Sequence, residues 1–220
     1  GHVYPSGMAA NIVAAGESLL GLLMFAIATG LMYGRFSQPK AFLQYSNNAL
    51  FSPFKGGTAL MFRFAPYKKH FLSEVEVKVT LVAQLFEDGA LRNRFFNLDL
   101  ELSKANSLIL NWTVVHPINE HSPFFNLSKE DILQSKAELL VYVKGYDEGF
   151  ANTVISRSSY TPDELVFGAR FVLMYEAGKE GNHTVLDHSK LNEFEPAALP
   201  PSSISVEQPK ELEREMDPQG

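Results

Sequence analysis

The sequence contains no cysteine, which excludes disulfide bonds, thiolate nucleophiles and cysteine-ligated zinc sites. It also lacks an excess of positive charge. The net charge is −6, and residues 193–220 hold seven acids against two bases, so that segment alone carries −5 and the remainder is nearly neutral. A protein that binds nucleic acid through its bulk charge would be basic, so we expect no nucleic-acid partner.

Patterns that indicate catalysis are missing as well. The six histidines are scattered, and the nearest pair, His116 and His121, is separated by Pro117. Two histidines placed five residues apart across a proline do not converge as the i, i+4 pair of a helical zinc motif does. We interpret them as structural histidines, with a metal site as the less favoured alternative, and predict that the protein is not an enzyme.

Polar residues are scarce between positions 8 and 33, where Glu17 is the only charged side chain. A helix of this length crosses a hydrocarbon core of about 30 Å. Arg35 and Lys40 follow the run whereas no Lys or Arg precedes it, so the positive-inside rule places the C-terminal end in the cytoplasm. We predict a transmembrane helix that ends before Pro39, with a buried helix of a soluble protein as the alternative.

Glu17 is unusual because an acid inside a membrane span normally faces a protein interior or an aqueous cavity. Gly21, Phe25, Thr29 and Tyr33 follow it at intervals of four residues and therefore lie along one side of the helix. Spacing alone leaves two interpretations equally open: the wall of a pore, or a face that packs against other helices.

From about residue 41 to 192 the pattern changes to alternation with a period of two. The segments "EVEVKVTL" (74–81) and "LDLEL" (98–102) show it clearly, and "LIL", "WTVV", "ELLVYV" and "RFVLMY" indicate further strands. A short helix is expected to begin at Ser128, because "SKED" supplies a capping serine and an acid three residues later. This pattern predicts a β-sandwich of the immunoglobulin type, followed after Phe194 by a disordered acidic tail.

Several separately spaced motifs then point to a known family. The segments "GHVYPSG", "AIATGLMYGRFSQPKA", "LMFRFA", "WTVVHPINEHSPFF" and "SRSSYTPDEL" occur in the order found in the prokaryotic branch of the inward-rectifier potassium channels. The chain resembles this family from Gly1 to about Phe194. The resemblance implies a homotetramer in the cell membrane, with a cytoplasmic C-terminal domain and voltage-independent gating. It also implies potassium as the permeant ion, with no other cofactor and no metal site.

The resemblance also divides the chain. It implies that residues 1–7 are the end of the selectivity filter, with Gly1 as its last glycine, and an extracellular turn. Residues 8–36 would be the pore-lining inner helix and residues 37–45 a linker at the membrane surface. Residues 46–194 would be the cytoplasmic immunoglobulin-like β-sandwich and residues 195–220 an acidic tail. The outer helix and pore helix of the family would precede Gly1.

The family's functional positions can be carried over residue by residue. Phe25, Thr29 and Tyr33 would line the pore, with Tyr33 at the gate and Gly21 at a helix hinge. Anionic lipids such as phosphoinositides would bind Arg35, Lys40, Lys68 and Lys69. The cytoplasmic path would be lined by Glu74, Lys144, Gly145, Tyr146 and Gly149, the last four in a constricting loop over residues 144–152. Phe25 and Lys144 stand where strongly rectifying members have acids, and Gln38 where animal members tend to have a base.

We therefore expect the pore-lining and regulatory portion of a tetrameric potassium channel, gated where the inner helices cross and modulated by anionic lipids. The alternative is an interaction protein, in which a single membrane span anchors a β-sandwich that binds a partner chain.

Overall fold

The computed structural model describes residues 4–36, 41–67, 71–87, 89–177 and 184–200. The chain divides into two compact units, Gly1–Pro39 and Lys40–Gly220.

The first unit is one helix, α1, over Met8–Phe36. The chain enters it through Pro5 and Gly7, whose φ of 93° is readily available only to glycine, and the Gly7 carbonyl accepts the Asn11 N–H at 3.1 Å. At about 1.5 Å per residue, the helix is longer than the roughly 30 Å of a hydrocarbon core. Among the described residues, α1 is the one helix long and apolar enough to span a membrane. It covers the residues for which the sequence predicts a transmembrane helix.

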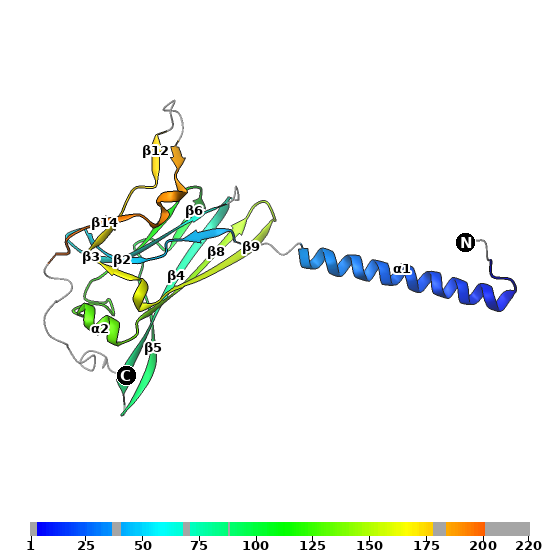
Figure 1. The fold of residues 1–220 in the computed structure, drawn as a ribbon, viewed down its shortest axis with the longest axis horizontal. Helices are drawn as coiled ribbons and strands as arrows, with labels where there is room; N and C mark the ends of the chain where they lie inside the picture. The colour runs from blue at the N-terminus through cyan, green and yellow to red at the C-terminus, as the bar shows by residue number, and fades with distance from the viewer. Residues whose placement is uncertain (1–3, 37–40, 68–70, 88, 178–183, 201–220) are drawn as a thin grey trace. The chain divides into compact units, whose positions relative to one another are not determined.

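The second unit contains two five-stranded sheets (Figure 1). The first sheet has the order β1-β3-β2-β10, with β7 also paired to β3, and all pairs except β10 with β2 are antiparallel. Its strands are β1 Leu43–Tyr45, β2 Ala49–Phe54, β3 Gly57–Pro66, β7 Trp112–Pro117 and β10 Leu165–Phe167. The second sheet is antiparallel with the order β5-β4-β8-β9, and β6 also pairs with β4. Its strands are β4 Leu72–Glu87, β5 Ala90–Asn97, β6 Lys104–Leu108, β8 Glu138–Asp147 and β9 Asn152–Tyr160.

The main core lies between these two sheets. Val77 and Val79 of β4 are buried while Glu76 and Lys78 are not, as the alternation in the sequence predicts. The same core contains aromatic residues of the first sheet, among them Phe51, which stacks on Phe167 with ring centroids 4.4 Å apart. The predicted β-sandwich is confirmed.

The remaining elements are short. Helix α2 spans Lys129–Gln134, and Ser128 caps it through a capping box with Asp131, which confirms the predicted start. Two 3₁₀ helices and two small sheets are the other elements of the domain among the residues that the structure describes. They are η1 Pro162–Glu164, η2 His188–Asn192, the pair β11 Ala169–Phe171 with β14 Phe194–Pro196, and the pair β12 Tyr175–Ala177 with β13 Thr184–Leu186.

Three strand predictions were wrong. Residues 98–102 form no strand, because this segment passes from one sheet to the other: the Leu98 N–H bonds the Val79 carbonyl and the Glu101 N–H the Val115 carbonyl, both at 2.9 Å. Of "LIL", only Leu108 is in a strand. The segment "RFVLMY" is split between β11 and β12, because Val172 leaves the strand and donates to the Glu193 carbonyl at 3.2 Å.

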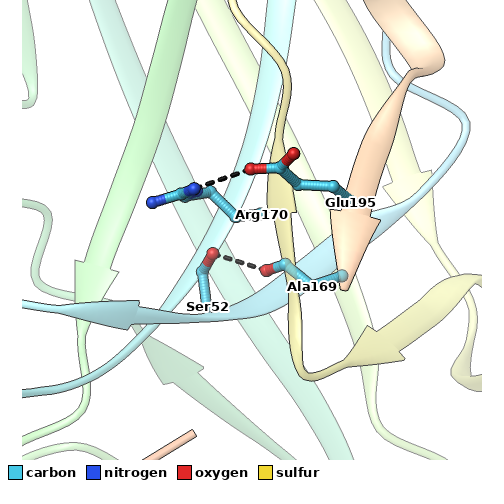
Figure 2. Close-up of polar contacts among 4 residues, drawn as sticks. All are labelled: Ser52, Ala169, Arg170 and Glu195. Carbon is cyan, nitrogen blue, oxygen red and sulfur yellow. Dashed lines mark hydrogen bonds and ion pairs between the residues drawn. The ribbon is translucent and has the colours of Figure 1, made fainter. Parts of the chain in front are cut away.

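Two short strands lie partly or wholly outside the expected domain bounds of 46–194. The last residues of the expected linker form β1, which pairs with β3. At the other end, β14 includes Glu195 and Pro196, which were expected in the tail. In Figure 2 the Arg170 and Glu195 side chains point toward one another, with 2.6 Å between Nη2 and Oε1, and Ser52 Oγ donates to the Ala169 carbonyl at 2.5 Å. These contacts fix the end of the domain to β2.

Candidate functional site

The stripe predicted on α1 lies on one exposed side of the helix. Phe25 and Tyr33 are 71% and 74% exposed, Thr29 and Glu17 are also exposed, and no atom lies within 4 Å of a Cβ built on Gly21. None of the helix residues is buried by other parts of the described chain. Within the described part of the helix unit nothing covers the stripe, so its apolar side chains are free to contact lipid or further protein chains.

Of the basic residues expected to contact lipid, only Arg35 lies within the residues that the structure describes. Arg35 lies in the last turn of α1 and is exposed. A cation there also complements the negative end of the helix dipole. The expected positions Gly1, Lys40, Lys68 and Lys69 lie outside the described residues.

The outer face of the second sheet carries a cluster of charges around Glu76. The strand register places Glu76 opposite Lys104 of β6 on one side and Lys144 of β8 on the other. Glu76 Oε1 lies 3.7 Å from Lys104 Nζ and 3.8 Å from Lys78 Nζ. One carboxylate therefore lies among three lysines.

Glu74, the acid expected on the cytoplasmic path, does not take part in this ladder. The pairing of β4 with β8 shifts between Ser73 and Glu76, and Glu74 lies in that bulge with a φ of 49°. It is exposed. Lys144 therefore faces Glu76 across the strands, a relationship that the sequence pattern alone does not indicate because the bulge interrupts the alternation.

The expected constricting loop is shorter than predicted. Lys144, Gly145 and Tyr146 belong to β8, and the turn between β8 and β9 contains only Glu148–Ala151. Asp147 Oδ1 accepts the N–H groups of Gly149 at 2.9 Å and Phe150 at 3.1 Å, which fixes the turn. The role of these residues in a constriction stays a prediction.

Gly145 is buried in the sheet. A Cβ built on it would lie 3.4 Å from both Leu72 Cβ and Val75 Cγ2. The absence of a side chain here therefore allows β4 residues to pack over the β8 backbone, which gives this glycine a packing role.

Arg63 is a buried charge that the sequence reading did not single out. Its side chain lies on the side of β3 away from the main core, 2% exposed. Nε donates to the Leu191 carbonyl at 2.8 Å, Nη1 to Val172 at 2.5 Å, and Nη2 to Glu193 at 3.0 Å and to Lys190. Its guanidinium also lies 4.3 Å from the Phe171 ring centroid. Burial lowers the pKa of Arg63 to about 10, while the charge of Glu193 acts in the opposite direction. The signal was an arginine inside the apolar strand "LMFRFA", because an arginine is rarely buried without partners.

His116 is a structural side chain, as the sequence suggests. Its ring nitrogens lie 2.6 Å from the Asp99 carbonyl and 2.8 Å from Ser122 Oγ. The carbonyl can only accept, so Nδ1 carries the proton and Nε2 accepts from Ser122. Burial lowers the pKa of His116. His121 is exposed.

Comparison with known proteins places this architecture in a family. A family model described as the inward rectifier potassium channel C-terminal domain matches residues 43–213. The chain is 34% identical over 195 residues to the inward rectifier potassium channel Kirbac3.1 of Paramagnetospirillum magnetotacticum, covering 88% of this chain and 66% of that protein. It is 29% identical over 184 residues to the G protein-activated inward rectifier potassium channel 4 of Bos taurus, and this match covers 79% of this chain and 43% of that protein.

Among solved structures, the sporulation control protein Spo0M of Bacillus subtilis aligns with a TM-score of 0.30 at 8% identity, over 61% of this chain and 58% of that one, which is too low to carry an argument. The chain spans less than two thirds of the length of both channel relatives. The family match covers well over half of the chain and begins at β1. The chain therefore belongs to the inward rectifier potassium channel family, whose members are ion channels and not enzymes.

Proposed function

We propose that this chain supplies the pore-lining helix and the cytoplasmic regulatory domain of a potassium channel that assembles as a homotetramer in the cell membrane. The observation that carries the proposal is the combination, in one chain, of a long apolar helix with no buried residue and a domain that matches the family. Potassium is the permeant ion, and anionic lipids modulate the gate.

The gate is a ring of four Tyr33 side chains. Phe25, Thr29 and Tyr33 share one side of α1, and a fourfold arrangement that turns this side inward gives polar Thr29 and Glu17 access to water. A narrow ring of bulky, largely apolar side chains excludes water, and therefore ions, even when it is not sterically sealed.

Replacing Tyr33 with alanine tests this gate. A suitable host is the channel in which an outer helix, a pore helix and a selectivity filter, the segments that the family resemblance implies, precede residue 1. Potassium flux into vesicles, normalised to the amount of assembled tetramer, should rise in Tyr33→Ala because the constriction widens and fills with water. Selectivity for potassium over sodium should not change, since the filter sets it.

Leu31→Ala is the matched control, because Leu31 is 70% exposed and lies two residues away, on the opposite side of the helix. We expect no rise in flux per tetramer for this variant. Equal flux in the Tyr33 and Leu31 variants would contradict the gate and favour the other common role of tyrosine at this depth, an anchor at the membrane interface.

The lipid contacts are Arg35, Lys40, Lys68 and Lys69. Each basic side chain near an anionic membrane surface contributes about 1 kcal/mol, so neutralising Arg35 and Lys68 together removes about 2 kcal/mol of attraction. The flux response to phosphoinositide in the vesicles should then be blunted. Lys55→Gln is the control. Lys55 lies in the turn between β2 and β3 and forms an ion pair with Glu101, so we expect this variant to leave the lipid response unchanged. An unchanged response in the Arg35 and Lys68 double variant would remove these residues from the lipid site.

A further inference from the structure

A basic surface lies on the outer face of the second sheet, in a protein whose net charge is negative. Its members are exposed residues on four neighbouring strands: Lys78 on β4, Lys104 on β6, Lys144 on β8 and Arg157 on β9. We refer to these four residues as the basic face.

The register of the strands fixes the spacing of the basic face. Lys104 and Lys144 are both opposite Glu76, whereas Lys78 and Arg157 are both opposite Tyr142. Neighbouring strands lie about 4.8 Å apart and alternate residues of one strand about 6.7 Å apart, so the four residues form a zigzag with steps of about 8 Å. Arg157 also lies over the Tyr142 ring, 5.6 Å from its centroid, which holds it on this face.

The positive charge of the basic face is not balanced within the described residues. Glu76 is the only acid in the ladder between these residues, and it pairs with Lys78 and Lys104. Four bases and one acid give a local charge of +3. The other acids on these strands are Glu74 in the bulge, Glu138 opposite Val82, Glu87 at the end of β4, and Asp147 at the end of β8, which is buried. Lys144 and Arg157 form no ion pair with any residue that the structure describes.

We propose that the basic face binds the acidic C-terminal segment, residues 201–220, of the same chain. This segment holds five acids against Lys210 and Arg214, a charge of −3 that matches the basic face. Four of the acids alternate along "ELEREMD": Glu211, Glu213, Glu215 and Asp217. In an extended chain they share one side at intervals of about 6.7 Å, which long lysine and arginine side chains spaced by about 8 Å can meet.

The segment is long enough to reach the basic face. It follows Pro200, and Leu199 packs against the main core, so its origin is fixed to the domain. Twenty extended residues span up to about 70 Å, whereas a domain of this size has a radius of gyration of about 15 Å. Because the segment is tethered, its effective concentration is of millimolar order, so even weak ion pairs keep the basic face occupied.

This binding does not depend on the proposed channel function. If the same face also lines the cytoplasmic path, a bound segment would reduce ion flow there, and that consequence alone rests on the proposed function.

A photo-crosslinker in the acidic segment tests the proposal. Benzoylphenylalanine replaces Leu212 in the whole chain, purified in detergent at low salt, and crosslinked peptides are identified by mass spectrometry. We expect crosslinks to β4, β8 and β9, and a loss of yield in 1 M salt, where the screening length falls to roughly 3 Å. Crosslinks that map mainly to other elements would overturn the proposal.

Charge variants give the decisive comparison. Lys78→Glu with Lys144→Glu changes the local charge from +3 to −1 and should lower the crosslink yield roughly fivefold or more. Lys129→Glu, a single reversal in α2, should leave the yield unchanged. Replacing Glu211, Glu213 and Glu215 with glutamine should lower the yield equally without touching the folded domain. An unchanged yield in this triple variant would refute the proposal even if the lysine variants misfold.

Discussion

Arg63 gives the sharpest test of how the C-terminal part of the domain is held. We consider Arg63→Met, which keeps an unbranched apolar stem and removes the charge and the donors. Residues 172–193 follow β11 and contain four carbonyls that accept hydrogen bonds from this arginine. The substitution leaves all four without that donor.

The cost can be worked out from the burial of each acceptor. The bond to Leu191 is fully buried, and leaving its carbonyl unpaired costs about 1–3 kcal/mol. The other three bonds are partly buried, so water replaces part of each and the loss is about 1 kcal/mol apiece. The contact with Phe171 adds about 0.5–1 kcal/mol, and the methionine recovers some packing. We expect a net loss of about 3–5 kcal/mol.

This loss should appear as local opening. It is comparable to the total stability of many domains, about 5–15 kcal/mol, but it falls on a segment whose contacts are separate from the main core. Hydrogen exchange should speed up by roughly two to four orders of magnitude at the amide of Asp187, which bonds the Met174 carbonyl at 2.7 Å. The amides of β4 and β8 should remain protected.

Arg170→Met is the matched control in the same part of the chain. Arg170 pairs with Glu195, and both side chains are more than half exposed, so the expected change is about 0–1 kcal/mol. If both variants change the Asp187 exchange rate to the same extent, or if Arg63→Met leaves it unchanged, the bonds from Arg63 do not hold this segment.

Three further predictions concern other parts of the domain. Because burial lowers the pKa of His116 in the folded state, the unfolded state binds the proton more readily. The free energy of unfolding should therefore fall as the pH drops below about 6.5. His116→Gln should remove up to about 2 kcal/mol of that fall by pH 5, as measured by urea unfolding. Ser128→Ala removes the cap of α2 and should cost about 1 kcal/mol, seen as a lower midpoint in the same assay. Gly145→Ala should change stability by less than about 1 kcal/mol, since the added Cβ meets Leu72 and Val75 at contact distance. Gly145→Val should cost about 1–3 kcal/mol because its further methyl groups overfill this space. Equal thermal midpoints for the two variants would contradict this packing.

Sequence reasoning works well where the signal is local. Helix α1 follows from a long run between Pro5 and Pro39 in which Glu17 is the only charged residue before Arg35, and the start of α2 follows from the spacing of Ser128 and Asp131. The buried valines of β4 follow from alternation along a single strand. Each of these features depends on neighbours within a few residues, so the residue pattern records it directly.

The errors share a different cause, which is pairing between distant segments. Leu98 lies in an alternating stretch, yet its N–H donates to a carbonyl of β4 in the second sheet. The N–H of Glu101 donates to a carbonyl of β7 in the first sheet, so the segment forms no ladder with either sheet. Tyr45 and Glu195 lie in stretches without a clear strand pattern, yet β3 and β11 supply partners for them. Periodicity shows which side chains can share a face, but it does not show which backbone groups will meet.

The bulge at Glu74 shows how much a single irregular residue can change the expected site. Strict alternation places Glu74 and Glu76 on the same face and gives Lys144 two nearby acids. The bulge leaves Glu76 alone opposite Lys144, and Glu76 already pairs with Lys78 and Lys104. The local charge of the face is therefore +3, whereas a continuous strand would have added Glu74 to the same face and lowered it to +2. The φ of 49° that produces this result falls on a glutamate, a residue with no preference for it, so the charge of this face had to be read from the register.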